Sequence, residues 1–172
     1  MFVSNVLSRV LIISASILSL AGCQTMATDI PFDAAEASFI KNAGTTKITG
    51  HAFRQHFPRP INSAGEVVRL IPVTAYSHDR FEKIYSGDKF VHALLVPKVE
   101  FDPQYLEYSR STKTESDGRF SFEGVGPGKY YIATEVTWTK DTMILPDGGI
   151  VYDEVTITGK ETDPVKVILS GN

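Results

Sequence analysis

From residue 45 onward, apolar and polar side chains alternate along the chain, a period of two that is typical of half-buried strands. The predicted strands cover residues 46–53, 66–77, 109–116, 119–123, 129–139, 150–158 and 165–170. Turn residues bound these segments, and hardly any helical pattern separates them. About seven short strands with this spacing predict an all-β, antiparallel sandwich.

The second predicted strand presents two apolar faces. Val68 and Leu70 share one face, and Val67, Arg69, Ile71 and Val73 share the other. Pro72 has no amide hydrogen to donate, so this strand must lie at a sheet edge, carry a bulge or break there.

The start of the chain has a different pattern. An apolar run from Val10 to Leu20 follows a single basic residue, Arg9, and ends in Leu-Ala-Gly-Cys, where Cys23 is the only cysteine. The run is shorter than the roughly 20 residues that span a bilayer as a helix, but it matches the ~7 to 15 apolar residues of an export signal. This arrangement resembles a bacterial lipoprotein export signal.

The resemblance implies that residues 1–22 are a signal peptide and that Cys23 carries acyl chains. Residues 23–32 would then be the lipidated tether of a domain at 33–172. Two or more acyl chains hold a protein stably at a membrane. Gln24, rather than aspartate, follows the cysteine, which implies the outer membrane, with the domain facing the periplasm. The alternative is a buried N-terminal helix with an incidental cysteine.

A short helix is expected where the domain begins. Asp33 is positioned as the N-cap with Glu36 three residues later, which is a capping-box pattern. Gly44 is the expected end of this helix.

The most specific motif is the block from Asp117 to Ile132, DGRFSFEGVGPGKYYI. Its Asp-Gly pair predicts a tight turn, after which Phe120 and Phe122 alternate inward along a strand. The glycines and the proline that follow bend the chain around Val125, whose side chain is expected to tuck under the end of the sandwich.

This block resembles the carboxypeptidase regulatory-like domain. The matching residues are Thr114 and Glu115 before the turn and the Pro-Gly-Lys-Tyr corner at 127–130, with looser matches at Gly50 and Val68-Arg69-Leu70. The resemblance implies a seven-stranded antiparallel Ig-like, transthyretin-like sandwich. Because its motifs specify a core, it implies no particular binding or catalytic site.

A long insertion, about residues 77–108, interrupts the strand pattern. Asp79 with Glu82, and Asp102 with Pro103, predict two short helix starts. The candidate binding surface consists of six aromatic side chains, Phe81, Tyr85, Phe90, Phe101, Tyr105 and Tyr108. The alternative is that the insertion folds back as a buried layer over the sandwich.

Charge and motifs exclude several function classes. The net charge is −3, and the sequence contains no cluster of lysine and arginine residues. We therefore expect no nucleic-acid partner. No phosphate loop, serine-hydrolase elbow or zinc-peptidase motif occurs, so no catalytic residue, cofactor or metal ligand is predicted, and the chain is not expected to be an enzyme. Two metal sites stay open as alternatives. One would bind a metal through His51, His56, His78 and His92, and the other would bind calcium through Asp141, Asp147 and Asp153; the default is that these side chains are solvated.

Two functions follow as hypotheses. The favoured one is a non-catalytic cell-envelope lipoprotein that binds another envelope protein or a polymer through the aromatic insertion or a strand edge. The alternative is a small-ligand carrier or enzyme with a pocket between the insertion and the sandwich. A third, structural idea is an isopeptide bond between Lys47 and Asn172, of the kind that some pilin and adhesin sandwiches form.

Overall fold

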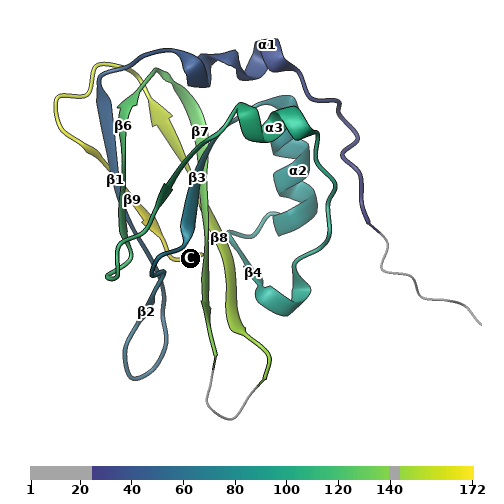
Figure 1. Ribbon diagram of the computed structural model, residues 1–172, viewed down its shortest axis with the longest axis vertical. Coiled ribbons are helices and arrows are strands. Elements are labelled where there is room, and N and C mark those ends of the chain that lie inside the picture. The colour runs from purple at the N-terminus through teal and green to yellow at the C-terminus, as the bar shows by residue number, and fades with distance from the viewer. Residues whose placement is uncertain (1–24, 140–143) are drawn as a thin grey trace, which may run out of the picture.

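Two β-sheets pack face to face in the computed structural model, which describes residues 25–139 and 144–172 (Figure 1). The first sheet contains β1 (Thr46–Arg54), β2 (Ile61–Asn62), β6 (Arg119–Val125) and β9 (Val165–Leu169). The second has the order β4 (Phe90–His92), β8 (Asp147–Ile157), β7 (Gly128–Trp138), β3 (Val67–Pro72) and β5 (Arg110–Lys113). All pairs are antiparallel except β1 with β9, which run parallel. The predicted all-β sandwich is confirmed. The prediction of seven antiparallel strands is wrong: the structure describes nine strands, because β2 and β4 form in segments without the alternating pattern, and the β1–β9 pair is parallel.

The two faces predicted for β3 are also confirmed. Val68 and Leu70 are fully buried in the core between the two sheets, together with Ile132 of β7. Ile71 points the other way, into a second apolar cluster on the outer face of the five-stranded sheet. That outer face is covered by the helix α2 (Ala75–Tyr85), so the molecule has three layers (Figure 1).

The end of β3 differs from the prediction. The strand stops at Pro72 and α2 begins at Ala75, where the pattern predicted strand to residue 77 and a helix start at Asp79. The Thr74 hydroxyl accepts a hydrogen bond from the Ser77 amide at 3.1 Å, and the Ser77 hydroxyl accepts one from the Thr74 amide at 2.8 Å. Val73 still donates a backbone hydrogen bond to Lys129 of β7 at 2.9 Å, and the reciprocal cap then starts the helix at the next two residues.

The rest of the insertion forms β4, a 3₁₀ turn η2 (Ala93–Leu95) and the helix α3 (Pro103–Glu107). The helix start predicted at Asp102 and Pro103 is confirmed, because the Asp102 carboxylate accepts a hydrogen bond from the Gln104 amide at 2.8 Å.

The turn block behaves as its sequence predicts. Phe120, Phe122 and Val125 are all buried in the core between the sheets. Gly118 takes the left-handed conformation that the tight turn needs, with φ at 81°. Phe120 pairs across the sheet with Gly50, and its ring occupies the space where a side chain at residue 50 would lie.

The substitution Gly50→Ala is expected to lower the free energy of unfolding by about 1 to 3 kcal/mol, the usual cost of overpacking. A Cβ at residue 50 would overlap the tip of the Phe120 ring, so that ring must move. In a Phe120→Leu background the added cost of Gly50→Ala should shrink, because the shorter side chain leaves the space free. Urea denaturation of the four proteins measures this coupling, and purely additive costs would contradict it.

The N-terminal helix is shorter than predicted. It consists of α1 (Ala34–Ala37) followed by a 3₁₀ turn, η1 (Ser38–Lys41), and does not continue to Gly44. The Asp33 carboxylate caps it as expected, accepting a hydrogen bond from the Ala35 amide at 2.8 Å. Glu36 does not complete a capping box, because its carboxylate instead accepts a hydrogen bond from the Ala75 amide at the start of α2, at 2.9 Å.

Residues 25–32, the described part of the expected tether, lie against the domain. Met26 donates a hydrogen bond to the Lys98 carbonyl at 2.9 Å and accepts one from the Glu100 amide at 2.8 Å. Asp29 forms an ion pair with Lys83 of α2 at 2.7 Å. The chain is therefore attached to the insertion before the first helix begins.

The turn between β8 and β9 is held to β1 by one carboxylate. Glu161 accepts hydrogen bonds from the Thr158 amide and hydroxyl, both at 2.7 Å, from the Gly159 amide at 2.9 Å and from the buried Thr46 hydroxyl at 2.8 Å. The bonds from Thr158 are the main reason that the pKa of Glu161 falls to about 2.

Glu161 should therefore make stability depend on pH in acid. A carboxylate whose pKa is lower in the folded state contributes stability above its unfolded pKa, and this contribution is lost as the pH falls from about 4.5 towards 2. We expect the urea midpoint of the wild type to fall more steeply between pH 6 and pH 3 than that of Glu161→Gln. Parallel curves for the two proteins would contradict the assignment.

Candidate functional site

A cleft of about 270 Å³ lies between the insertion and the outer face of the five-stranded sheet. Arg69 of β3 and Ala133 of β7 line it from the sheet, and Arg80 and Tyr85 line it from α2. Phe101, Tyr105 and Leu106 line it from α3 and the segment before it. The five-stranded sheet, α2 and the segment around α3 therefore build one open cleft together.

Stacked aromatic rings support one side of this cleft. The Phe81 ring lies 4.1 Å from that of Tyr131, centroid to centroid, at an interplanar angle of 17°. Tyr85 packs against Phe81 at 5.4 Å and against Tyr152 at 4.4 Å. These contacts join α2 to β7 and β8, so the aromatic wall is part of the core and not a mobile loop.

The phenols of this wall stay protonated at neutral pH. Burial raises the pKa of Tyr85 and that of Tyr105, and it raises the pKa of Tyr131 to about 12. The Tyr85 hydroxyl has no hydrogen-bond partner within residues 25–139 and 144–172, and its side chain lines the cleft. It can therefore donate a hydrogen bond to a ligand.

Two arginines supply the charge at the cleft. Arg80 donates to the carbonyls of Val99 and Glu100 at 2.8 and 2.9 Å, and its guanidinium lies 5.2 Å from the Phe101 ring centroid. Arg69 forms no ion pair with any residue that the structure describes. The cleft thus combines aromatic faces with planar, multidentate donors, a set suited to binding a ligand rich in oxygen atoms.

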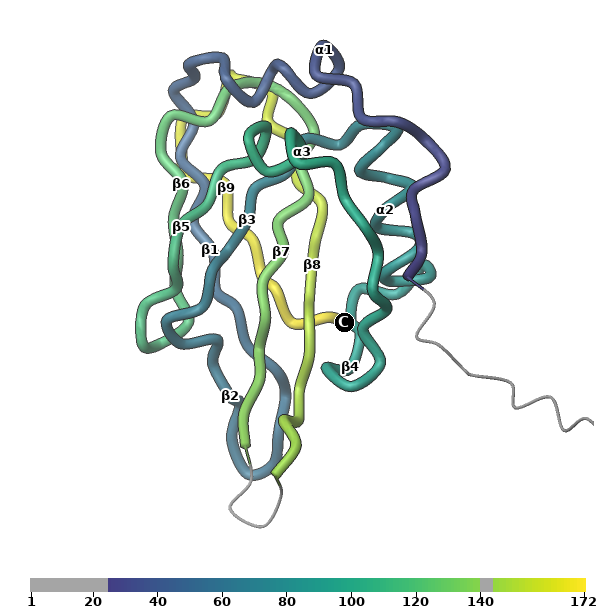
Figure 2. The backbone as a smooth tube through the Cα atoms, turned by 45° about the vertical axis from the view of Figure 1, so that its right-hand side comes forward, coloured from purple at the N-terminus to yellow at the C-terminus, as the bar shows by residue number. Residues whose placement is uncertain are grey.

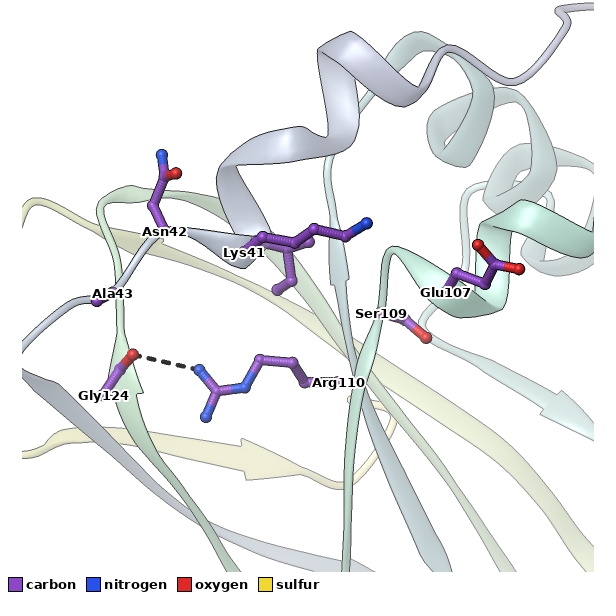
Figure 3. A pocket seen from close by; sticks show the side chains of 8 residues that line it. Lys41, Asn42, Ala43, Glu107, Ser109, Arg110 and Gly124 are labelled. Atoms are coloured by element: carbon purple, nitrogen blue, oxygen red, sulfur yellow. Dashed lines mark hydrogen bonds between the residues drawn. The ribbon is translucent and has the colours of Figure 1, made fainter.

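A second, larger cleft of about 450 Å³ lies at the end of the sandwich, between η1 and β5 (Figure 3). Lys41, Asn42, Glu107 and Arg110 surround it. Its cations already have protein partners: Arg110 donates to the Gly124 carbonyl at 3.3 Å, and Lys41 lies 3.5 Å from the centroid of the Tyr108 ring. The first cleft is the better candidate site because it offers Arg69 and aromatic surface together.

The structure divides the six predicted aromatic residues. Phe81, Tyr85, Phe101 and Tyr105 all line the first cleft. Of these, Phe81, Tyr85 and Tyr105 are buried, and only Phe101, at 47%, is well exposed. For the three buried rings, the structure matches the alternative of an extra layer over the sandwich.

Phe90 and Tyr108 lie outside the cleft. Both are half-buried and pack against the core between the sheets. The Arg54 guanidinium covers Phe90 at 3.9 Å from the ring centroid, and Lys41 covers Tyr108 in the same way. Neither ring presents a free face at the aromatic cleft.

The arginines of the cleft were not predicted from the sequence. Arg80 lies four residues after Tyr76 and four before Ile84, so a helix placed at 75–85 puts all three on one face. Arg69 alternates with Val68 and Leu70 and therefore points away from the core between the sheets. Recognising Thr74 as the N-cap of this helix would have placed Arg80 on the same face as Tyr76 and Ile84.

The histidines of the described chain lie apart, each with a different neighbour. His51 is 3.2 Å from Asn62, His78 is 3.0 Å from the Tyr131 hydroxyl, and His92 is 3.2 Å from Asp147. The His56 ring packs edge-on against that of Trp138. Within the described residues, no three histidine, cysteine or acidic side chains gather closely enough to hold a metal ion. Asp153 pairs with Lys89 at 2.6 Å, and Asp141 lies outside the described residues.

The isopeptide idea does not fit the strand register. β1 and β9 run parallel, with Ile48 opposite Val165 and Ala52 opposite Leu169. Lys47 therefore lies where the pair begins, in an ion pair with Glu123 at 2.6 Å, whereas Asn172 lies past its other end, beside Phe90. At about 3.3 Å per residue, the strand length alone separates the two by more than about 10 Å.

The lipid anchor cannot be located in the structure, because Cys23 and residues 1–22 lie outside the described residues. The longest described helix, α2, has 11 residues, and none of the described helices combines the length and hydropathy of a membrane span.

One solved structure with a similar fold is that of a proposed carbohydrate binding protein from Pseudomonas aeruginosa. The two chains are 27% identical, the TM-score is 0.68, and the alignment covers 83% of this chain and 99% of that one. No protein-family model matches the chain. No curated protein matches it either.

Proposed function

We propose that this chain is a non-catalytic binding module of the cell envelope and that its ligand is a carbohydrate, bound in the aromatic cleft. The observation that carries the proposal is that Arg69, Arg80, Tyr85 and the exposed Phe101 ring all line one cleft. The likeness to a proposed carbohydrate binding protein along nearly its whole length supports the ligand class.

The chemistry of the cleft suits a sugar. A pyranose presents hydroxyl oxygens around its edge, which guanidinium and phenol groups can bind as donors, and apolar C–H groups on its face, which pack on an aromatic ring. Arg69 has no acidic partner among the described residues, which favours a sugar that carries a carboxylate or another negative group.

The same cleft gives little support to catalysis. Glycoside hydrolysis uses a pair of carboxyl groups on either side of the scissile bond. The side chains that line the described cleft are aromatic, aliphatic and arginine. At about 270 Å³ and open to solvent, the cleft fits one unit of a longer polymer better than a wholly enclosed small ligand, which favours the binding module over the carrier.

The envelope location is part of this proposal. The apolar run that ends at Cys23 supports this location. In the proposal, acyl chains on Cys23 hold the domain at the outer membrane, facing the periplasm. The carboxypeptidase regulatory-like, transthyretin-like type of sandwich is proposed on the block from Asp117 to Ile132.

Direct binding measurements test the ligand. The full chain, purified in detergent, is titrated by calorimetry with neutral and acidic oligosaccharides from bacterial envelopes. We expect saturable binding that Phe101→Ala weakens at least tenfold. The matched control is Phe57→Ala, which removes an even more exposed ring, at 91%, from the loop between β1 and β2. No saccharide binding, or equal losses in both variants, would overturn the proposal.

The anchor is tested separately by mass spectrometry of the N-terminal peptide. We expect residues 1–22 to be absent and Cys23 to carry a diacylglyceryl thioether. In the variant Cys23→Ala, the protein should leave the membrane fraction or keep its first 22 residues. A wild-type chain with a free thiol and an intact N-terminus would refute the anchor without affecting the carbohydrate result.

A further inference from the structure

An exposed apolar surface lies at η2, immediately after the edge strand β4. Leu94 and Leu95 are 54% and 74% exposed, and Val96 beside them is exposed as well. Three adjacent exposed aliphatic side chains form a patch of the kind that marks a contact surface. They lie outside both clefts.

This surface continues towards the start of β8. His92 of β4 pairs with Gly149 of β8, and its ring nitrogen lies 3.2 Å from the Asp147 carboxylate. Leu145, two residues before Asp147, is also exposed. The segment that carries the patch therefore follows directly on the edge strand of the five-stranded sheet, on the side of the molecule where Figure 1 labels β4.

The N-terminal segment is attached next to this patch. Met26 is hydrogen-bonded to Lys98 and Glu100, and Lys98 is only two residues beyond Val96. Figure 2 shows the described chain beginning beside α2, on the side of the molecule where β4 lies. Cys23 precedes Met26 by three residues, so the two can be at most about 11 Å apart.

We propose that the η2 surface, consisting of Leu94, Leu95, Val96 and Lys98, lies in the headgroup layer of the membrane that holds the anchor. The inference rests on the proposed lipidation of Cys23. Because the chain is already attached to the domain at Met26, the anchor holds the domain close to the bilayer instead of on a long tether. The aliphatic side chains enter the acyl boundary, and the exposed Lys98 ammonium remains among the headgroup phosphates.

Site-directed quenching tests this orientation. Cys23 is the only natural cysteine, so once it is acylated, Leu95→Cys provides a single free thiol for a bimane label. Full-length protein is reconstituted into vesicles of phosphatidylethanolamine and phosphatidylglycerol with or without doxyl-labelled lipid. The matched control is Ile168→Cys, at a 61% exposed aliphatic position on β9 of the other sheet.

We expect doxyl lipid to quench the label at residue 95 at least threefold more strongly than the label at residue 168. Equal, weak quenching at both positions in protein with an acylated Cys23 would overturn the orientation and leave the anchor intact. Two labelled thiols per chain in Leu95→Cys would instead show that Cys23 is not acylated, which overturns the anchor and the orientation together. Circular dichroism checks that both variants keep the wild-type fold.

Discussion

Replacing Phe81 by alanine is expected to lower the free energy of unfolding by about 3 to 5 kcal/mol, the usual cost of removing a buried phenylalanine ring. Phe81 is 4% exposed and contacts Tyr85, Tyr131 and Tyr152, so its loss leaves a cavity between α2 and the sheet. Urea denaturation followed by far-ultraviolet circular dichroism measures the change.

Phe101→Ala is the matched control for this prediction. It removes the same side chain from the same cleft, but from a half-exposed position, so the expected loss is below about 1 kcal/mol. Similar losses in the two variants would show that α2 is not a packed third layer. The pair therefore separates the role of the insertion in stability from its proposed role in binding.

The second large effect is expected at Arg80. Arg80→Ala removes two charge-assisted hydrogen bonds to backbone carbonyls and the cation beside Phe101, for a loss of about 1.5 to 3 kcal/mol. Without this clamp the segment from Val99 to Phe101 should open more often, so its amides should exchange with solvent faster. Saccharide affinity is expected to fall at least tenfold, since the segment that carries the Phe101 ring is no longer held at the cleft.

Arg80→Lys refines this prediction. Both carbonyls accept from one guanidinium nitrogen, Nη1. Lysine keeps the charge and has donors on one nitrogen, but its shorter, non-planar side chain reaches the carbonyls less well, so we expect an intermediate loss of stability. Arg119→Ala serves as the control, because among the described residues the exposed Arg119 forms an ion pair only with Asp117; it should change neither hydrogen exchange at residues 99–101 nor saccharide affinity. Unchanged hydrogen exchange at residues 99–101 in Arg80→Ala would contradict the clamp.

The core of the sandwich follows from local pattern. The alternation at Val68 and Leu70, and again at Phe120 and Phe122, assigned the buried faces correctly because a strand places every second side chain on the same side. The turn at Gly118 could also be predicted from the sequence, because its left-handed backbone conformation favours glycine.

The insertion was less readable because its stabilising contacts are remote. Phe81 is buried by Tyr131 and Tyr152, which follow it by 50 and 71 residues, and no local period encodes such pairs. The start of α2 was mispredicted because apolar and polar residues go on alternating past Pro72, which indicated a strand. In the structure, the hydrogen bonds between Thr74 and Ser77 cap a helix there. Aromatic residues alone therefore could not show which of them line a cleft.

Local sequence pattern was sufficient to predict the sandwich, the faces of its strands and the turn that joins β5 to β6, because strand period and turn chemistry are properties of neighbouring residues. Only the folded chain shows that Arg69 of the sheet shares one cleft with Arg80 and the aromatic rings of the insertion, and that Met26 is attached beside the exposed η2 surface. Both depend on contacts between segments far apart in the chain, which form only when α2 packs on the five-stranded sheet.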